Sequence, residues 1–472
     1  MEAIGSATID LNDDTYTFTS EYNQNATESI LEPSVVIDDI DNSEGLHKHL
    51  VTENKHLLGV CNKVMKECYT AKELSTAAKR GKARTVIRTL VINSIKVFEK
   101  NPTKWQTVSL NKNDWDKGGR YYKLRLKAEQ LSKAVQRLAE NGYVELVLGN
   151  QHWNPKERKQ TRIRATAKLI EAVDLINLAK DKDRWKSAKD SPRIELRAAK
   201  ERPGAIAQPI TVARLPSHIA ECERFLEKYQ ALLDTTIISL PAEITGKKGD
   251  IFKGEFTPYD KYVRRVFNNG AWDKGGRLYG GFWQGFSKEA RLTILLDGQE
   301  VTEIDIRATF PVLVYHSLGI DYWGDLSSEE WIEEVDPYYI DGYTGEDYRK
   351  ALKKISSSLI NATNEGKNQG WLTWLIRKEN ISKRVNEEAP ALIKKFIAKH
   401  PQIPFFDGEV GMKMMFLESE IALAVIKEFT RLGKPVLTVH DSFIAKKEDN
   451  HLLNETIVNA YYKVTGFTPF LT

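Results

Sequence analysis

Two apolar runs in the last third of the chain each bring one aspartate to the end of a predicted strand, and they constrain the fold most. Residues 437–447 read Leu-Thr-Val-His-Asp-Ser-Phe-Ile-Ala-Lys-Lys, so strand-forming residues continue on both sides of a polar corner that contains Asp441. This pattern predicts a tight hairpin. Residues 301–315 predict a strand that ends at Asp305 and a helix that begins after it. We therefore expect a sheet with two strand-end carboxylates.

Composition places the chain among ordinary globular proteins. It has 472 residues, of which 41% are hydrophobic, and this length allows two to four domains. No run of about 18 apolar residues occurs, so no membrane partner is expected, and the first residues lack an export signal. Cys61, Cys68 and Cys222 form no CxxC or Cys/His spacing, which argues against a disulfide framework or a structural zinc. We expect a cytoplasmic protein that is monomeric or weakly associating.

Charge is unevenly distributed along the chain. Residues 1–45 carry eleven Asp and Glu and no Lys or Arg, which predicts a disordered acidic leader. Residues 155–202 carry fifteen Lys and Arg against eight Asp and Glu. Such a stretch is either a solvated face or a surface for a polyanion. Residues 179–210 overlap the end of this stretch. They are rich in charged residues at first and then contain Pro and Gly, so we predict a basic linker there.

The segment before this linker has helices followed by a hairpin. Apolar residues recur at helical spacing over 82–100 and again over 128–140. Strands are predicted at 143–148 and 161–165, and the polar loop 150–160 between them carries Lys and Arg. Helices followed by a hairpin with a basic tip therefore precede the linker.

This order resembles the winged helix-turn-helix family over about residues 82–169, within a predicted domain 46–178. The resemblance implies that the helix before the hairpin enters the major groove of DNA and that the wing contacts phosphate. It assigns DNA binding to five basic residues, Lys133, Arg137, Lys156, Arg158 and Lys159. A small α+β domain without a role in DNA binding is the alternative interpretation.

The two strand-end aspartates suggest metal chemistry. In a chain without zinc-type ligands, carboxylates that converge from separate strands can hold two Mg²⁺ ions for an in-line displacement at phosphorus. Upstream, residues 274–284 predict a glycine-rich turn that carries Arg277, whose guanidinium can clamp a phosphate. Between the aspartates, Arg349 and Lys353 stand four residues apart on one face of a predicted helix. A cationic helix face near two metal ions can bind a triphosphate.

The order of these motifs resembles the family A DNA polymerases and the related single-subunit RNA polymerases of phages and mitochondria, over about residues 255–472. The resemblance implies that Asp305 and Asp441 are the catalytic, Mg²⁺-binding aspartates. It places Arg349 and Lys353 on the nucleotide-binding helix of the fingers. It assigns template or primer contacts to Arg277, Gln284 and His440.

Three positions depart from the family A pattern. Ser442 follows the His-Asp pair where those DNA polymerases usually have Glu, as in the single-subunit RNA polymerases. Asn361 replaces a tyrosine of the nucleotide-binding helix, and we keep it among the nucleotide-binding candidates. Phe310 stands where these DNA polymerases carry Glu, and it resembles the aromatic gate that excludes a ribose 2′-hydroxyl in reverse transcriptases. A core residue at a helix start is the other interpretation of Phe310.

We therefore predict an α+β protein with an N-terminal winged helix and a palm-fingers-thumb core at 211–472. Thumb helices are expected at 211–260, and palm and fingers at 261–472. The predicted function is a template-directed DNA polymerase that uses two Mg²⁺, with a DNA template-primer and nucleoside triphosphates as partners. An RNA template stays open. The alternatives are a single-subunit RNA polymerase or primase, and a non-catalytic replication initiator or regulator that binds DNA.

Overall fold

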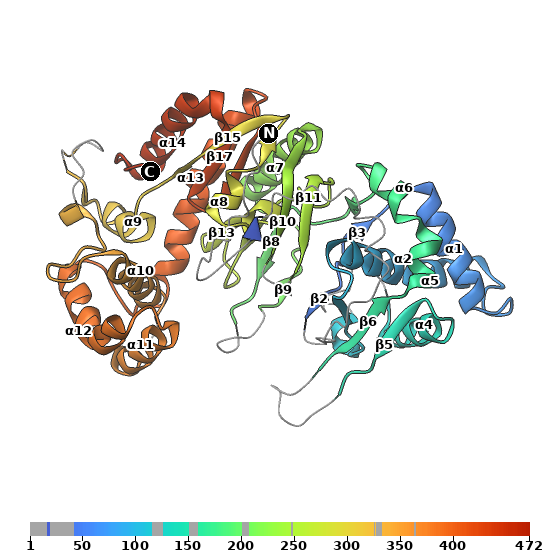
Figure 1. Ribbon diagram of the computed structural model, residues 1–472. Coiled ribbons are helices and arrows are strands. Elements are labelled where there is room, and N and C mark those ends of the chain that lie inside the picture. The colour runs from blue at the N-terminus through green and yellow to red at the C-terminus, as the bar shows by residue number, and fades with distance from the viewer. Residues whose placement is uncertain are drawn as a thin grey trace, which may run out of the picture. The chain divides into compact units, whose positions relative to one another are not determined.

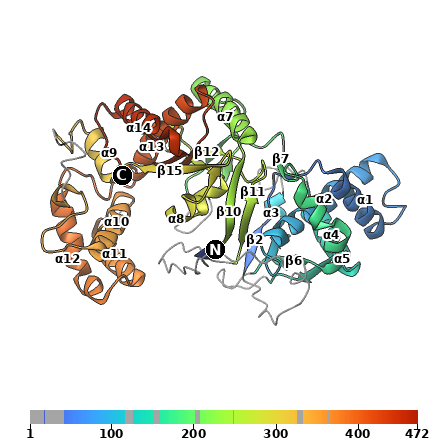
Figure 2. The same cartoon turned by 45° about the horizontal axis from the view of Figure 1, so that its top comes forward.

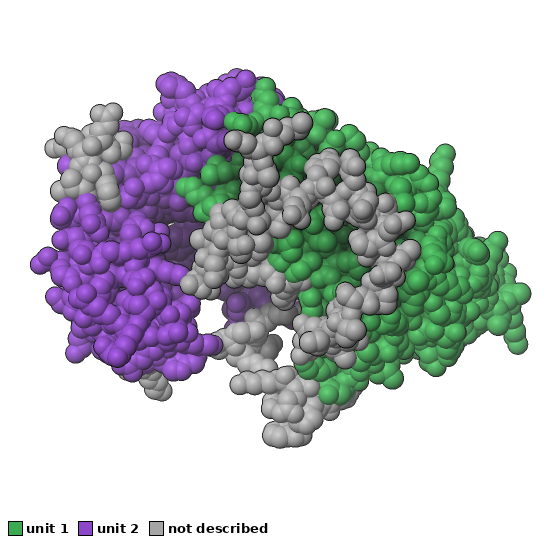
Figure 3. Space-filling view, in the orientation of Figure 1, with its two compact units in different colours: residues 1–192, 233–262, 280–300 green, residues 193–232, 263–279, 301–472 purple. Residues whose placement is uncertain are grey.

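The chain forms two compact units, which are described separately below. The computed structural model describes residues 17–18, 42–115, 126–150, 159–200, 207–246, 249–324, 326, 333–362 and 365–472. Unit 1 comprises residues 1–192, 233–262 and 280–300, and unit 2 comprises residues 193–232, 263–279 and 301–472 (Figure 3). Both contain helices and sheets, so the predicted α+β class is confirmed.

Three amphipathic helices build the core of unit 1: α1 (Lys55–Cys68), α2 (Ala77–Lys100) and α4 (Ala128–Glu140) (Figure 1). Their buried faces share one hydrophobic cluster. The predicted helix 128–140 is confirmed. The predicted helix 82–100 is also confirmed but begins earlier, because the Thr76 side chain accepts a hydrogen bond from the Lys79 amide and caps the helix there.

The predicted hairpin is present as β5 (Val144–Val147) and β6 (Thr161–Ala165), which pair antiparallel. Two further strands, β4 (Trp105–Val108) and β2 (Ser43–Gly45), complete the sheet in the order β2-β4-β6-β5. β2 lies inside the predicted disordered leader, which corrects that prediction at its C-terminal end.

The remaining elements of unit 1 are short. Residues 17–18 form β1 (Thr17–Phe18), also inside the predicted leader, and the rest of residues 1–41 lies outside the described part of the chain. The other strands of this unit are β3 (Leu50–Val51), β7 (Lys186–Ser187), β10 (Ile238–Thr245), β11 (Ile251–Glu255) and β14 (Leu295–Leu296), and its other helices are α3 (Lys112–Trp115), α5 (Ala167–Val173), α6 (Leu175–Lys180) and α8 (Lys288–Arg291). β1 pairs with β10, which also pairs with β11 and β14.

Three antiparallel strands of a larger sheet lie at the centre of unit 2. β15 (Gln299–Asp305) pairs with β17 (Ser442–Lys446), and β17 forms a hairpin with β16 (Val436–Val439). Both strands predicted from the aspartate motifs are therefore confirmed. Three helices pack around this sheet and one another: α9 (Thr309–Ser317), α13 (Val410–Arg431) and α14 (Asn450–Thr465).

A second sheet in unit 2 corrects two predictions. Its order is β13-β12-β8-β9, from β13 (Gly275–Tyr279), β12 (Arg264–Phe267), β8 (Ile194–Arg197) and β9 (Pro209–Ile210). Residues 179–210 are thus not simply a linker, because Ile194 and Leu196 alternate with charged residues and bury one face of a strand. In the glycine-rich segment 274–284, Arg277 lies on the strand β13 and not in a turn, and a 3₁₀ turn (Phe282–Gly285) follows.

The thumb prediction for residues 211–260 is also corrected. Among the described residues of this segment only α7 (Ser217–Thr235) is an α-helix, and the β-branched residues after it continue as β10 and β11. The other helices of unit 2, α10 (Glu346–Ile360), α11 (Glu365–Glu379) and α12 (Lys383–Lys399), form a cluster around their own core (Figure 1, Figure 2). Among the described residues, no helix has the length and apolar character needed to cross a membrane.

The central sheet of unit 2 depends on the fully buried Phe443 of β17. We expect Phe443→Ala to lower the free energy of unfolding by about 3–5 kcal/mol, because it leaves a cavity that the strands cannot fill. Tyr462→Ala on α14, where the side chain is 60% exposed, should change it by less than about 0.5 kcal/mol. Urea denaturation of both variants measures this, and equal losses would contradict the assignment of the core.

Candidate active site

Asp305 and Asp441 lie at one edge of the central sheet of unit 2. Asp305 ends β15 directly opposite Ser442, the first residue of β17. Asp441 belongs to the two-residue loop that joins β16 to β17, and its carbonyl accepts a hydrogen bond of 3.2 Å from the Ile306 amide. His440, the other loop residue, has a φ of 59°, so the tight turn requires left-handed backbone there. The two aspartates therefore stand on adjacent strand ends.

The charges of Asp305 and Asp441 act on the same neighbours. Both contribute to raising the pKa of Glu418 and of the buried Tyr338. The Asp441 carboxylate also accepts a hydrogen bond of 2.6 Å from the Thr309 hydroxyl at the start of α9. Burial raises the pKa of Asp441. The site thus concentrates negative charge in a partly dry environment.

A third carboxylate, Glu418 of α13, completes this group. Its side chain is buried and forms a two-pronged ion pair with Arg277 of β13, with Nε to Oε1 at 3.0 Å and Nη2 to Oε2 at 2.5 Å. Burial raises the pKa of Glu418 to about 8, and the charge of Asp441 adds to this effect against the opposing attraction of Arg277. The positive charge of Arg277 therefore offsets part of the negative charge of these acids.

Close packing of β13 on α13 makes the pair possible. Gly276 has a φ of 78°, and a Cβ atom there would lie 2.7 Å from the Ser419 hydroxyl and 3.0 Å from Arg265 Nη2. Arg265 is itself buried, and its Nε donates to the Gly276 carbonyl at 2.7 Å while Nη2 donates to Ser419 at 2.8 Å. Gly276, directly before Arg277, therefore allows the close packing of β13 on α13.

The predicted cations of α10 lie at the same site. Arg349 Nη2 pairs with the buried Asp336 at 2.9 Å, and Asp336 also contacts Arg307 at 3.4 Å. Burial and then the charge of Arg349 lower the pKa of Lys353, whereas Asp305 acts in the opposite direction. Lys353 is therefore close enough to Asp305 to feel its charge. The helix brings one cation to the aspartates and anchors the other on Asp336.

Phe310 and His440 lie beside these groups. The Arg277 guanidinium stands over the ring of Phe310 at 5.1 Å, and Phe310 is only partly buried. Its position is therefore not that of a fully buried core residue. The His440 ring contacts Tyr279 of β13 edge to face, with centroids 6.0 Å apart.

Two predicted residues have other surroundings. Asn361 ends α10, where its Nδ2 donates to the Ser357 carbonyl at 2.8 Å and its carboxamide lies against Gly411 of α13. Its side chain therefore fastens one helix to another. Gln284 belongs to a short 3₁₀ turn (Phe282–Gly285) in unit 1, and its Oε1 accepts from the Gly280 amide at 3.0 Å.

Sequence reasoning missed Glu418, Asp336, Thr309 and Tyr338. Glu418 had a detectable signal, because it interrupts an apolar face formed by Met414, Ile421 and Ala422 at helical spacing. Asp336 lies in an irregular segment, where no periodicity marks a buried acid. Thr309 contributes through a contact with the distant Asp441, which the sequence alone does not disclose.

The predicted DNA-binding residues lie in unit 1. Lys133 and Arg137 of α4 both pair with Glu73, at 2.7 Å and 2.8 Å. Lys159 is exposed at the foot of the hairpin loop, where its amide donates to Asn150. The other two predicted residues, Lys156 and Arg158, lie outside the described residues.

The residues at the aspartate site suit magnesium better than softer metals. Asp305, Asp441 and Glu418 supply only oxygen donors, and their mutual repulsion leaves negative charge for a cation to neutralise. Among the described residues, no three acidic, histidine or cysteine side chains form a ready metal cage. Mg²⁺ ordinarily completes its shell with waters and substrate phosphates. Asp305 and Asp441 therefore fit as its protein ligands.

Comparison with known proteins gives no family assignment. No protein-family model matches the chain, and no curated protein matches it. The function of this site is therefore inferred from its geometry and from the motifs described above.

The raised pKa of Glu418 predicts a pH dependence of stability. Between about pH 5 and pH 8 the folded chain keeps the Glu418 proton that the unfolded chain has released, so the free energy of unfolding should fall as pH rises. Glu418→Gln should remove this part of the decrease while keeping a hydrogen bond to Arg277.

Urea denaturation at several pH values, in a chelator, measures this effect. Glu455→Gln on α14, an exposed carboxylate, is the matched control and should retain the wild-type slope. Identical slopes for wild type and Glu418→Gln would show that Glu418 is ionised throughout this range.

Proposed function

We propose that this chain is a template-directed nucleotidyltransferase, a DNA polymerase that extends a primer with the help of two Mg²⁺ ions. The observation that carries the proposal is the meeting of Asp305 and Asp441 at adjacent strand ends, with Lys353 of α10 close to them. Two carboxylates and a facing cation match what phosphoryl transfer from a triphosphate requires.

Each residue then has a chemical task. When bound, the two ions supply activation of the primer 3′-hydroxyl and stabilisation of the leaving pyrophosphate. Asp305 and Asp441 hold the ions, and Thr309 fixes the orientation of the Asp441 carboxylate. Lys353 neutralises the triphosphate. Arg349 joins it by exchanging its contact with Asp336 for a phosphate oxygen.

The architecture of unit 2 supports the same assignment. The sheet β15-β17-β16 with α13 would be the palm, and the cluster α10–α12 would be the fingers that deliver the nucleotide. Arg277 and His440 would contact the primer-template beside the aspartates. Only α7 is available in the segment expected to form the thumb.

Unit 1 would bind DNA through α4 and the β5–β6 hairpin, in the manner of a winged helix. Lys133 and Arg137 both contact Glu73, so phosphate would have to replace one internal carboxylate at two cations. Their contribution to binding should therefore be smaller than that of unpaired cations, because the internal ion pairs must break first.

The nucleotides that are incorporated, and the need for a primer, distinguish the proposed DNA polymerase from the alternative functions. Ser442 occupies a position where the single-subunit RNA polymerases also have serine. It is buried and donates a hydrogen bond to Glu303, so the packing of the sheet explains why a serine stands there. Synthesis of new chains from ribonucleotides on single-stranded template without a primer would identify an RNA polymerase or primase instead. DNA binding without any incorporation would identify a non-catalytic initiator or regulator.

We expect Asp305→Asn and Asp441→Asn each to lower primer extension by about 10³-fold or more, because each removes a charge that holds a metal ion. Omission of Mg²⁺ should abolish extension. Extension of a labelled primer and binding of the same DNA are measured in parallel. Asp341→Asn, an exposed carboxylate of unit 2, is the control and should keep full activity. Undiminished extension by either aspartate variant would refute the proposed catalytic site.

Phe310 should set the preference for deoxynucleotides. Its partly buried ring lies beneath Arg277, and removing it in Phe310→Ala should raise ribonucleotide relative to deoxynucleotide incorporation by about tenfold. Phe416→Ala offers a matched control, because Phe416 is also partly buried and lies 5.8 Å from the Arg265 guanidinium. An unchanged ratio in an active Phe310 variant would exclude this role.

A further inference from the structure

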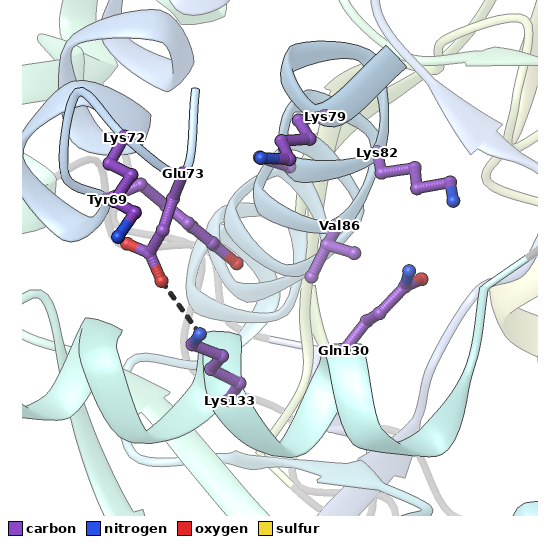
Figure 4. Close-up of a pocket in the computed structure, with 9 residues that line it drawn as sticks. Tyr69, Lys72, Glu73, Lys79, Lys82, Val86, Gln130 and Lys133 are labelled. Atoms are coloured by element: carbon purple, nitrogen blue, oxygen red, sulfur yellow. Dashed lines mark hydrogen bonds and ion pairs between the residues drawn. The ribbon is translucent and has the colours of Figure 1, made fainter. Parts of the chain in front are cut away.

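Unit 1 contains a pocket of about 370 Å³ whose wall includes only one of the residues assigned to DNA binding, Lys133 (Figure 4). It is lined by the loop between α1 and α2, the first turns of α2 and the first turns of α4. Lysine is the commonest residue in its wall, with Lys72, Lys79, Lys82 and Lys133. All four are exposed at their outer ends, so their ammonium groups are accessible to a ligand.

The pocket has an excess of positive charge. Glu73 is its one acid, and Lys133 and Arg137 already engage this carboxylate and hold its pKa below the usual range. Figure 4 shows Lys79 and Lys82 on α2, apart from this ion pair. Among the described residues, the hydrogen-bond partner of Lys79 Nζ is a hydroxyl, Ser75 Oγ at 3.4 Å. The cations on the α2 side therefore lack a carboxylate from the pocket wall.

The start of α2 makes this excess unfavourable without a ligand. The positive end of a helix dipole favours acidic residues in the first turn. The first turn of α2 instead carries Lys79 and Arg80 and has no acid, and Lys82 follows in the next turn. A bound anion would relieve this repulsion.

The floor of the pocket is apolar. Ala83 and Val86 of α2 are buried and belong to the hydrophobic core of unit 1. The Tyr69 ring adds a partly buried aromatic wall, and Gln130 extends its carboxamide from α4 toward Lys82 (Figure 4). A volume of about 370 Å³ lies within the range of small-molecule sites. The ligand should therefore combine a flat apolar part with a strongly anionic part.

We propose that this pocket binds one nucleotide, with its phosphate on Lys79 and Lys82 and its base over Val86 beside Tyr69. Bases pack on aromatic and apolar side chains, and lysines hold phosphate as point charges. Gln130 can hydrogen-bond the edge of the base. The nucleotide can be a free mononucleotide or an unpaired nucleotide of a strand. The site is independent of the proposed polymerase activity, because all its residues belong to unit 1.

Equilibrium binding to the full chain tests this inference. The probes are a fluorescent derivative of AMP, inorganic phosphate, and a short single-stranded DNA with or without a 5′-phosphate. Lys79→Gln/Lys82→Gln should weaken binding of the nucleotide probe at least tenfold. For the strand, the slope of log affinity against log salt should fall by about 0.7 for each phosphate group that the variant no longer neutralises.

Lys63→Gln/Lys66→Gln is the matched control, since it removes two exposed lysines of α1 in the same unit. It should change affinity less than twofold. Lys79→Arg/Lys82→Arg should keep most of the binding. The thermal midpoint of the glutamine variant should not fall, because the substitutions remove repulsion at the helix start.

The outcomes distinguish the two sources of nucleotide. Binding of AMP but not of the strand supports a free nucleotide, whereas binding of the strand supports an unpaired nucleotide of DNA. Equal affinities of the pocket and control variants would overturn the site. AMP that binds no more tightly than inorganic phosphate would overturn the role of the apolar floor.

Discussion

The gathering of three acids, Asp305, Asp441 and Glu418, in one place is the constraint on which unit 2 depends. Asp305 and Asp441 meet at one edge of the sheet because β17 pairs with β15 and forms a hairpin with β16. Helix α13 adds Glu418 to this group. Left alone, such a group would destabilise the folded chain. Arg277 and Lys353 offset it from two directions, one from the second sheet and one from α10. The cations of the site thus stabilise the fold as well as offering contacts for a substrate.

This arrangement links the two sheets of unit 2. Arg277 reaches Glu418 because Gly276 lets β13 approach α13 closely, and the buried Arg265 fixes that contact from the neighbouring strand. A Cβ atom at position 276 would clash with the Ser419 hydroxyl, and the left-handed backbone there favours glycine. Packing and electrostatics therefore depend on the same few residues.

Sequence reasoning was most accurate where one period dominates. The helix 128–140 and the strand 161–165 have the predicted bounds, because their buried and exposed positions follow a regular pattern. It failed where charge concealed a strand, as in β8, whose two apolar residues are separated by a glutamate.

Some residues of the candidate site could be predicted from the sequence and others could not. Asp305, Asp441, Arg277 and Lys353 could be predicted because each lies in a recognisable segment, and the structure brings them together. Asp336 and Thr309 could not, because they act through contacts with residues 13 and 132 positions away. Asn361 was placed by motif order, whereas its neighbours give it a role in joining helices.

Glu73 has a consequence beyond its own contacts. Its carboxylate already pairs with Lys133 and Arg137, so under the proposed DNA binding it would take the place of a phosphate on α4. A molecule with little negative charge would have to compete with the Glu73 carboxylate for these two cations, and it would gain little binding free energy. A polyanion, which offers several charges at once, can displace it and gain more than it loses. Unit 1 would thereby ignore stray acidic groups and respond to dense arrays of charge.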